Sequence, residues 1–78
     1  MKNKKEILGF LERYFVEELS QPAFNQDLKI EEIDGLDSLE IVNLSMALED
    51  KFGFEVRKEY FKKDMTFRQI IDLIVNNP

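Results

Sequence analysis

The sequence predicts an all-α fold: a small four-helix bundle of three main helices and one short third helix, with a long loop between the first and second helices. Three stretches show the apolar spacing of three and four residues that is typical of amphipathic helices. Each stretch begins with a cap residue followed three positions later by an acid or amide, the pattern of a capping box. These pairs are Asn3 with Glu6, Asp37 with Glu40, and Thr66 with Gln69.

The helix boundaries follow from these caps and from residues that stop helices. Helices are predicted over residues 4–19, 38–52, 57–61 and 67–75. Pro22 cannot continue the first helix, and Gly53 is placed to terminate the second. Residues 21–37 show no sustained period and are rich in turn-forming residues, so we predict a long loop there. No segment favours a β-strand. Loops of this length in small domains are often functional.

Length and composition indicate one folded domain that spans residues 1–78. A chain that is 44% hydrophobic is too apolar to be disordered. No apolar run approaches the roughly 20 residues of a membrane helix, so no stable membrane insertion is expected. The absence of cysteine excludes disulfides and favours the cytoplasm. Nothing in the sequence indicates oligomerisation, and we expect a monomer.

Several residue types that enzymes depend on are missing. The chain has no His and no Cys, which removes the usual general base, zinc ligands and strong nucleophile. Gly9, Gly35 and Gly53 lie too far apart to form a phosphate-binding loop. A calcium loop with Gly35 at its sixth position would place isoleucines where its first and last acids are required. We therefore predict no catalytic activity and no metal site.

Negative charge is concentrated in the middle of the chain. Residues 17–50 hold ten acids and one base, a net charge of −9 within a chain of net charge −5. Such a segment repels nucleic acid and anionic membranes, and it steers the protein towards basic patches on partner proteins. The same acidity could serve solubility alone, because many small proteins are acidic for that reason.

The predicted helix over residues 38–52 has two apolar stripes. One stripe consists of Ile41, Leu44, Leu48 and Phe52. The other lies nearly opposite, is bordered by Glu49 and Asp50, and consists of Leu39, Val42 and Met46. A domain this small can hardly bury both stripes. The second is therefore expected to be an exposed docking surface, unless the long loop folds over it.

Ser38 lies directly after the predicted cap Asp37, at the first position of this helix. Its hydroxyl would lie at the positive end of the helix dipole, which stabilises a phosphate group. The preceding loop would let a large attached group reach solvent. Ser38 has no histidine to activate it, so a modifying enzyme would have to supply the base. The alternative is that both residues only cap the helix.

The segment D-G-L-D-S-L-E-I-V-N-L-S-M-A-L-E-D-K-F-G-F-E-V, residues 34–56, resembles the central region of acyl carrier proteins. That family has a D-S-L motif, then a helix with an apolar and acidic face, and then a Phe followed by a β-branched residue. The resemblance continues through the T-x-x-x-x-I segment at residues 66–71 and covers the whole predicted architecture.

The resemblance implies a cofactor and partners. Ser38 would receive 4′-phosphopantetheine from coenzyme A, and Asp37 would help the phosphopantetheinyl transferase bind metal and substrate. Acyl groups would be carried as thioesters on this arm and presented to acyl-loading and acyl-processing enzymes. The partner-binding face would consist of Leu39, Glu40, Val42, Met46, Glu49 and Asp50. An acyl cavity would be walled by Leu44, Leu48, Val56, Phe61 and Ile71.

Departures from the family pattern favour a specialised pathway of the fatty-acid or polyketide type. The region of the third helix is unusually basic, with Arg57, Lys58, Lys62 and Lys63. Bulky Phe54, Tyr60 and Phe61 could fill the acyl cavity. Two alternatives stay open: an aminoacyl carrier of the D-alanyl or peptidyl kind, and an unmodified helical protein-interaction module.

Overall fold

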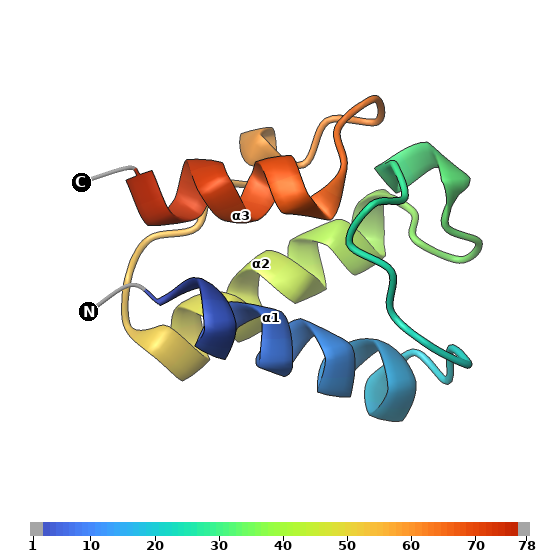
Figure 1. The fold of residues 1–78 in the computed structure, drawn as a ribbon, viewed down its shortest axis with the longest axis horizontal. Coiled ribbons are helices and arrows are strands. Elements are labelled where there is room, and N and C mark those ends of the chain that lie inside the picture. The colour runs from blue at the N-terminus through green and yellow to red at the C-terminus, as the bar shows by residue number, and fades with distance from the viewer. Residues whose placement is uncertain (1–2, 77–78) are drawn as a thin grey trace.

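The computed structural model describes residues 3–76. Three α-helices and three short helical turns follow one another along these residues (Figure 1). In chain order they are α1 (Lys4–Arg13), the π-helical turn η1 (Tyr14–Glu18), the 3-10 turn η2 (Ile30–Glu32), α2 (Ser38–Phe52), the 3-10 turn η3 (Lys58–Tyr60) and α3 (Phe67–Asn76). Within residues 3–76 no helix is long and apolar enough to cross a bilayer.

The three α-helices surround one core. Figure 1 shows α3 along one side, with α1 and α2 crossing below it, and η3 beside α3. The beginning of α1 and the second half of α3 are joined by an ion pair between Lys4 and Asp72. The core side chains are Ile7, Leu11, Phe15, Ile30, Leu36, Leu44, Leu48, Val56, Phe61, Phe67, Ile70, Ile71 and Ile74.

Phenylalanine rings occupy the centre of this core. The Phe67 ring is fully buried, and its centroid lies 5.4 Å from that of Phe15 and 5.3 Å from that of Phe24. Phe61 adds a fourth ring, 6.2 Å from Phe67. The rings meet edge-on or tilted, as aromatic pairs prefer. They connect η1, the following loop, the residue after η3 and α3.

The predicted helix starts are confirmed. The Asn3 side chain accepts hydrogen bonds from the backbone N–H groups of Lys5 and Glu6, and α1 begins at Lys4. Thr66 and Gln69 form both halves of a capping box: the Thr66 N–H donates to Gln69 Oε1 at 2.9 Å, and the Gln69 N–H donates to Thr66 Oγ1 at 3.3 Å.

The prediction of one α-helix over residues 4–19 is wrong at its end. Residues 14–18 form a π-helical turn, and the Leu19 N–H donates to the Tyr14 carbonyl at 3.2 Å. Ser20 then adopts a left-handed backbone with φ 56°, and the helix ends. The apolar spacing could not show this, because residues four apart share a face in both kinds of helix.

The connections are more ordered than a plain loop, and the short third helix is smaller than predicted. Residues 30–32 form a 3-10 turn, whose first N–H, that of Ile30, donates to the Met65 carbonyl at 3.0 Å. The helix expected over residues 57–61 is a single 3-10 turn, so a fourth helix is not confirmed. Lys29 and Thr66 form an isolated antiparallel bridge, and residues 3–76 contain no β-strand.

An exposed ion pair joins the loop to α3 and predicts a pH dependence. The Arg68 Nε–H donates to Asp27 Oδ1 at 2.8 Å, and this bond holds the pKa of Asp27 below its ordinary value. A lowered folded-state pKa contributes stability above the ordinary value, and this contribution is lost as the pH falls through the lowered pKa. Asp27→Asn should therefore slightly lower the melting temperature near neutral pH, and the difference should vanish in acid.

Thermal melts of both proteins from neutral pH down to about pH 2 would test this expectation. In an Arg68→Gln background, the Asp27→Asn change should have no such pH dependence. A difference that stays constant through the acid range would show that the ion pair is not its source.

Candidate functional site

Ser38 is the first residue of α2, and the three residues before it fix the position at which the helix begins. Asp37 Oδ1 accepts the Glu40 N–H at 2.9 Å, which caps the helix as predicted. Gly35 takes a left-handed φ of 80°, which only glycine adopts easily, and so turns the loop towards the cap. Leu36 is buried in the core and fixes this loop. The Ser38 side chain is therefore exposed to solvent, while its backbone is held by the Asp37 cap and the buried Leu36.

Ser38 differs from the other serines in the chain. Ser45, in the middle of α2, is 6% exposed, and its hydroxyl donates to the Val42 carbonyl at 2.8 Å. Ser20 is exposed but lies after the C-terminal end of the π turn, where the helix dipole disfavours an anion. Among the three serines, all within residues 3–76, Ser38 alone combines an exposed side chain with a helix N-terminus, where a phosphodiester would be stabilised.

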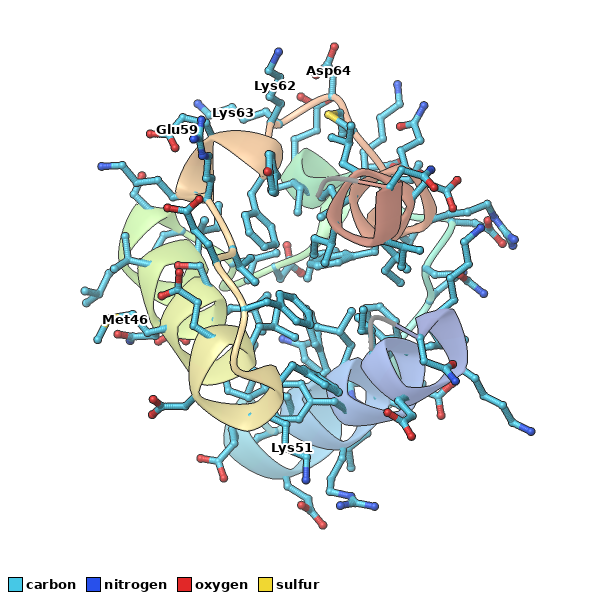
Figure 2. All side chains as sticks on the ribbon, turned by 90° about the vertical axis from the view of Figure 1, so that its left-hand side faces the viewer. Met46, Lys51, Glu59, Lys62, Lys63 and Asp64 are labelled. Atoms are coloured by element: carbon cyan, nitrogen blue, oxygen red, sulfur yellow. The ribbon has the colours of Figure 1, made fainter. Side chains whose placement is uncertain are left out.

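The second apolar stripe of α2 faces solvent. Leu39, Val42 and Met46 are 67%, 36% and 58% exposed, while Leu44 and Leu48 on the opposite side are buried. Figure 2 shows Met46 projecting outward from α2, away from the core. The alternative, in which the long loop folds over this stripe, is wrong. The stripe and Ser38 belong to the same helix, so a partner that reaches the serine can also contact the stripe.

The acids predicted for this face differ in their surroundings. Asp50 is exposed, and Glu40 is half-buried in the first turn of α2. Glu49 is half-buried, and its Oε2 accepts the backbone N–H of Val56 at 2.9 Å. Glu49 therefore ties the end of α2 to the connection that leads to η3. No local residue pattern indicates this bond, because Val56 lies outside α2 in the connection to η3.

The five side chains expected to wall an acyl cavity are all buried in the core that surrounds the phenylalanine cluster. Phe61 lies in that cluster, with its ring centroid 6.2 Å from that of Phe67. Among residues 3–76, no group of acids is arranged to hold a metal ion.

The residue pattern did not predict the recess beside Tyr14. This residue begins the π turn, and with Ala47 of α2 it lines the same recess. Burial raises the pKa of the Tyr14 hydroxyl above its ordinary value, and the negative charges of Glu40 and Glu18 raise it further. A recess of about 340 Å³ lies beside it, between α1, η1 and α2. The recess depends on the π turn, which the apolar spacing could not reveal.

Comparison with known proteins identifies the family of the chain. Residues 16–74 match the phosphopantetheine attachment site family. The chain is 41% identical over 73 residues to an acyl carrier protein of Campylobacter hominis, which covers 91% of this chain and 92% of that protein. It is 30% identical over 76 residues to an acyl carrier protein of Saccharopolyspora erythraea, over 95% of this chain and 80% of that protein. No solved structure gives a significant match.

The fold and the exposed serine define a small helical domain with a hydroxyl at the N-terminus of α2. The comparisons are more specific: the chain belongs to the phosphopantetheine-binding acyl carrier proteins. The cofactor of this family is 4′-phosphopantetheine, which is covalently attached. The residues around Ser38 fit such a group, because the hydroxyl is exposed and lies at a helix N-terminus. Proteins of this family are carriers rather than catalysts.

Proposed function

We propose that Ser38 carries the 4′-phosphopantetheine arm and that the chain, as one domain, holds acyl intermediates on it as thioesters. The observation that supports this most directly is the exposed Ser38 side chain at the N-terminus of α2, next to the cap Asp37. In this arrangement the helix dipole favours the phosphodiester of the arm. A flexible tether then presents one acyl group to several enzymes at high effective concentration.

The modification itself requires a transferase. The Ser38 oxygen attacks the β-phosphorus of the coenzyme A diphosphate, the serine proton passes to a base, and adenosine 3′,5′-bisphosphate leaves. The chain contains no histidine that could act as this base, so the phosphopantetheinyl transferase supplies it. Asp37, whose Oδ1 is held by the Glu40 N–H, would meet the transferase and its metal ion beside the reacting hydroxyl.

Partner enzymes would dock on the exposed stripe of α2. Its apolar centre is Leu39, Val42 and Met46, and its acids are Glu40, Glu49 and Asp50. Exposed apolar side chains supply the contact area, and the acids attract basic partner surfaces. The basic residues of segment 57–63 and the phenylalanines in the core support a specialised pathway of the fatty-acid or polyketide type rather than general fatty-acid synthesis.

The test is intact-mass measurement after incubation with coenzyme A, Mg²⁺ and a broad-specificity phosphopantetheinyl transferase. The wild-type chain should gain one phosphopantetheine unit. Ser38→Ala should gain none, and Ser45→Ala should gain the same unit as the wild type because its hydroxyl is buried. Modification of Ser38→Ala would place the arm elsewhere. A wild-type chain that several transferases leave unmodified would favour an unmodified interaction module.

Aminoacyl and acyl cargo would be distinguished next. The phosphopantetheinylated chain would be offered to an adenylating enzyme with D-alanine and, separately, to an acyl-loading enzyme with a fatty acid. Loading by the second enzyme alone would support the acyl carrier; loading by the first alone would identify an aminoacyl carrier.

A further inference from the structure

The exposed stripe of α2 is too small to be a complete docking surface. A specific interface buries about 800 Å² on each partner. Three side chains that are 36–67% exposed provide only part of that area. A partner that reacts at Ser38 must therefore also cover a neighbouring element. On one side α2 contacts η3, which lies above it in Figure 2. On the other side, residues of α1 and η1 line a recess together with Ala47 of α2, and the Phe10 ring meets that of Phe52.

The side of α1 offers a recess with apolar walls. The recess of about 340 Å³ is lined by Phe10, Arg13, Tyr14, Glu17, Glu18 and Ala47. Phe10 and Tyr14 stack with their ring centroids 6.0 Å apart and form an aromatic wall, and Ala47 leaves the α2 side of the recess open. Such a concave, partly aromatic site can take one anchoring side chain of a partner, which is how interfaces concentrate their binding energy.

The recess is continuous with the proposed docking face. Ala47 and Glu40 are seven residues apart in α2, so they lie on the same side of the helix, separated by about 10 Å along its axis. The raised pKa of Tyr14, caused by burial and then by Glu40 and Glu18, agrees with a position near the serine end of α2. A partner positioned over Ser38 could therefore reach Glu40, the recess and the π turn together.

The two sides of α2 differ in net charge. The α1 side presents Glu17, Glu18 and Glu40 with one base, Arg13. On the opposite side, residues 55–64 carry four bases and three acids. Figure 2 shows Glu59, Lys62 and Lys63 projecting from this second segment. A basic partner surface gains from the first side and is slightly repelled by the second.

We infer that the phosphopantetheinyl transferase docks over α2 and the α1–η1 side, inserting one apolar side chain beside Tyr14 and Ala47 and placing basic residues against Glu17, Glu18 and Glu40. The inference rests on the proposed function, because it concerns the enzyme that modifies Ser38. It assigns the π turn a part in recognition, in keeping with the frequent occurrence of such turns at functional sites.

Matched charge reversals on the two sides of α2 test this inference. The α1-side variant is Glu17→Lys with Glu18→Lys, and the control is Glu55→Lys with Glu59→Lys, which changes the net charge equally. The measurement is kcat/KM for transfer of phosphopantetheine from coenzyme A at low ionic strength. We expect a decrease of about tenfold for the α1-side variant and less than about twofold for the control. Lysines near the end of a helix suit its dipole, so the variant should fold.

A substitution that leaves the net charge unchanged tests whether the shape of the recess contributes to binding of the transferase. Ala47→Gln fills the recess with a good helix former and should lower kcat/KM several-fold at both low and high salt. Titration of the unmodified ¹⁵N-labelled chain with the transferase should shift the amide signals of Tyr14 and Ala47, which provides a measurement without any substitution. Equal losses for the two charge reversals, or unshifted amides at these residues, would overturn the inference. Failure of the wild-type chain to be modified at all would instead overturn the proposed function.

Discussion

The Phe67→Ala protein is expected to lose about 3–5 kcal/mol of unfolding free energy, the range measured for large aromatic truncations in protein cores. The Phe67 ring is fully buried and lies within about 5–6 Å of three other phenylalanine rings, centroid to centroid. Domains of this size have about 5–15 kcal/mol in total. The variant should therefore unfold at much lower urea concentration, measured by far-UV circular dichroism.

A substitution at the edge of the domain provides the control. Phe54 is half-buried, and its ring stacks on Phe52 with a centroid distance of 5.7 Å, away from the central cluster. Phe54→Ala removes the same side-chain atoms but leaves a site that water can reach, so its loss should be well under half that of Phe67→Ala. Equal losses would mean that the central cluster is no better packed than the rim.

The starts of the three α-helices and the end of α2 could be predicted because their signals are local. Asn3, Asp37 and Thr66 accept hydrogen bonds from N–H groups within three residues, and Gly53 ends α2 with a left-handed φ of 72°. Interactions of this kind depend on few neighbours, so the residue pattern contains them. The order in residues 21–37 could not be predicted, because it depends on hydrogen bonds to distant residues such as Lys63 and Met65. The π turn could not be predicted, because the apolar spacing does not distinguish it from an α-helical turn.

The candidate site also contains some features that a local residue pattern predicts and others that depend on tertiary contacts. The exposure of Leu39 and Met46 followed from helical periodicity alone, because one helix in a small domain cannot bury opposite faces. The recess beside Tyr14 could not be found, because it requires the relative position of α1 and α2. Family resemblance suggested Glu49 as a docking residue but gave no indication of its bond to Val56.

Because of this bond, we expect substitution of Glu49 to lower the unfolding free energy substantially. Its Oε2 accepts the Val56 N–H at 2.9 Å, and Val56 is 4% exposed. Glu49→Ala leaves this donor without its acceptor, which should lower the unfolding free energy by about 1–3 kcal/mol. Glu49→Gln keeps a side-chain oxygen that can accept the same bond, so it should recover most of the loss. Urea denaturation of the three proteins measures both differences.

The same pair of variants decides what Glu49 contributes to docking. If the carboxylate binds a basic partner residue, both variants should slow modification of Ser38, because both remove the negative charge. If Glu49 acts by holding the chain before η3, Glu49→Gln should be modified at the wild-type rate and only Glu49→Ala should differ. We expect the first result, because a carboxylate that accepts the Val56 N–H with Oε2 can still face a basic partner residue with its other oxygen. A slow Glu49→Gln protein of normal stability would assign Glu49 to the partner surface.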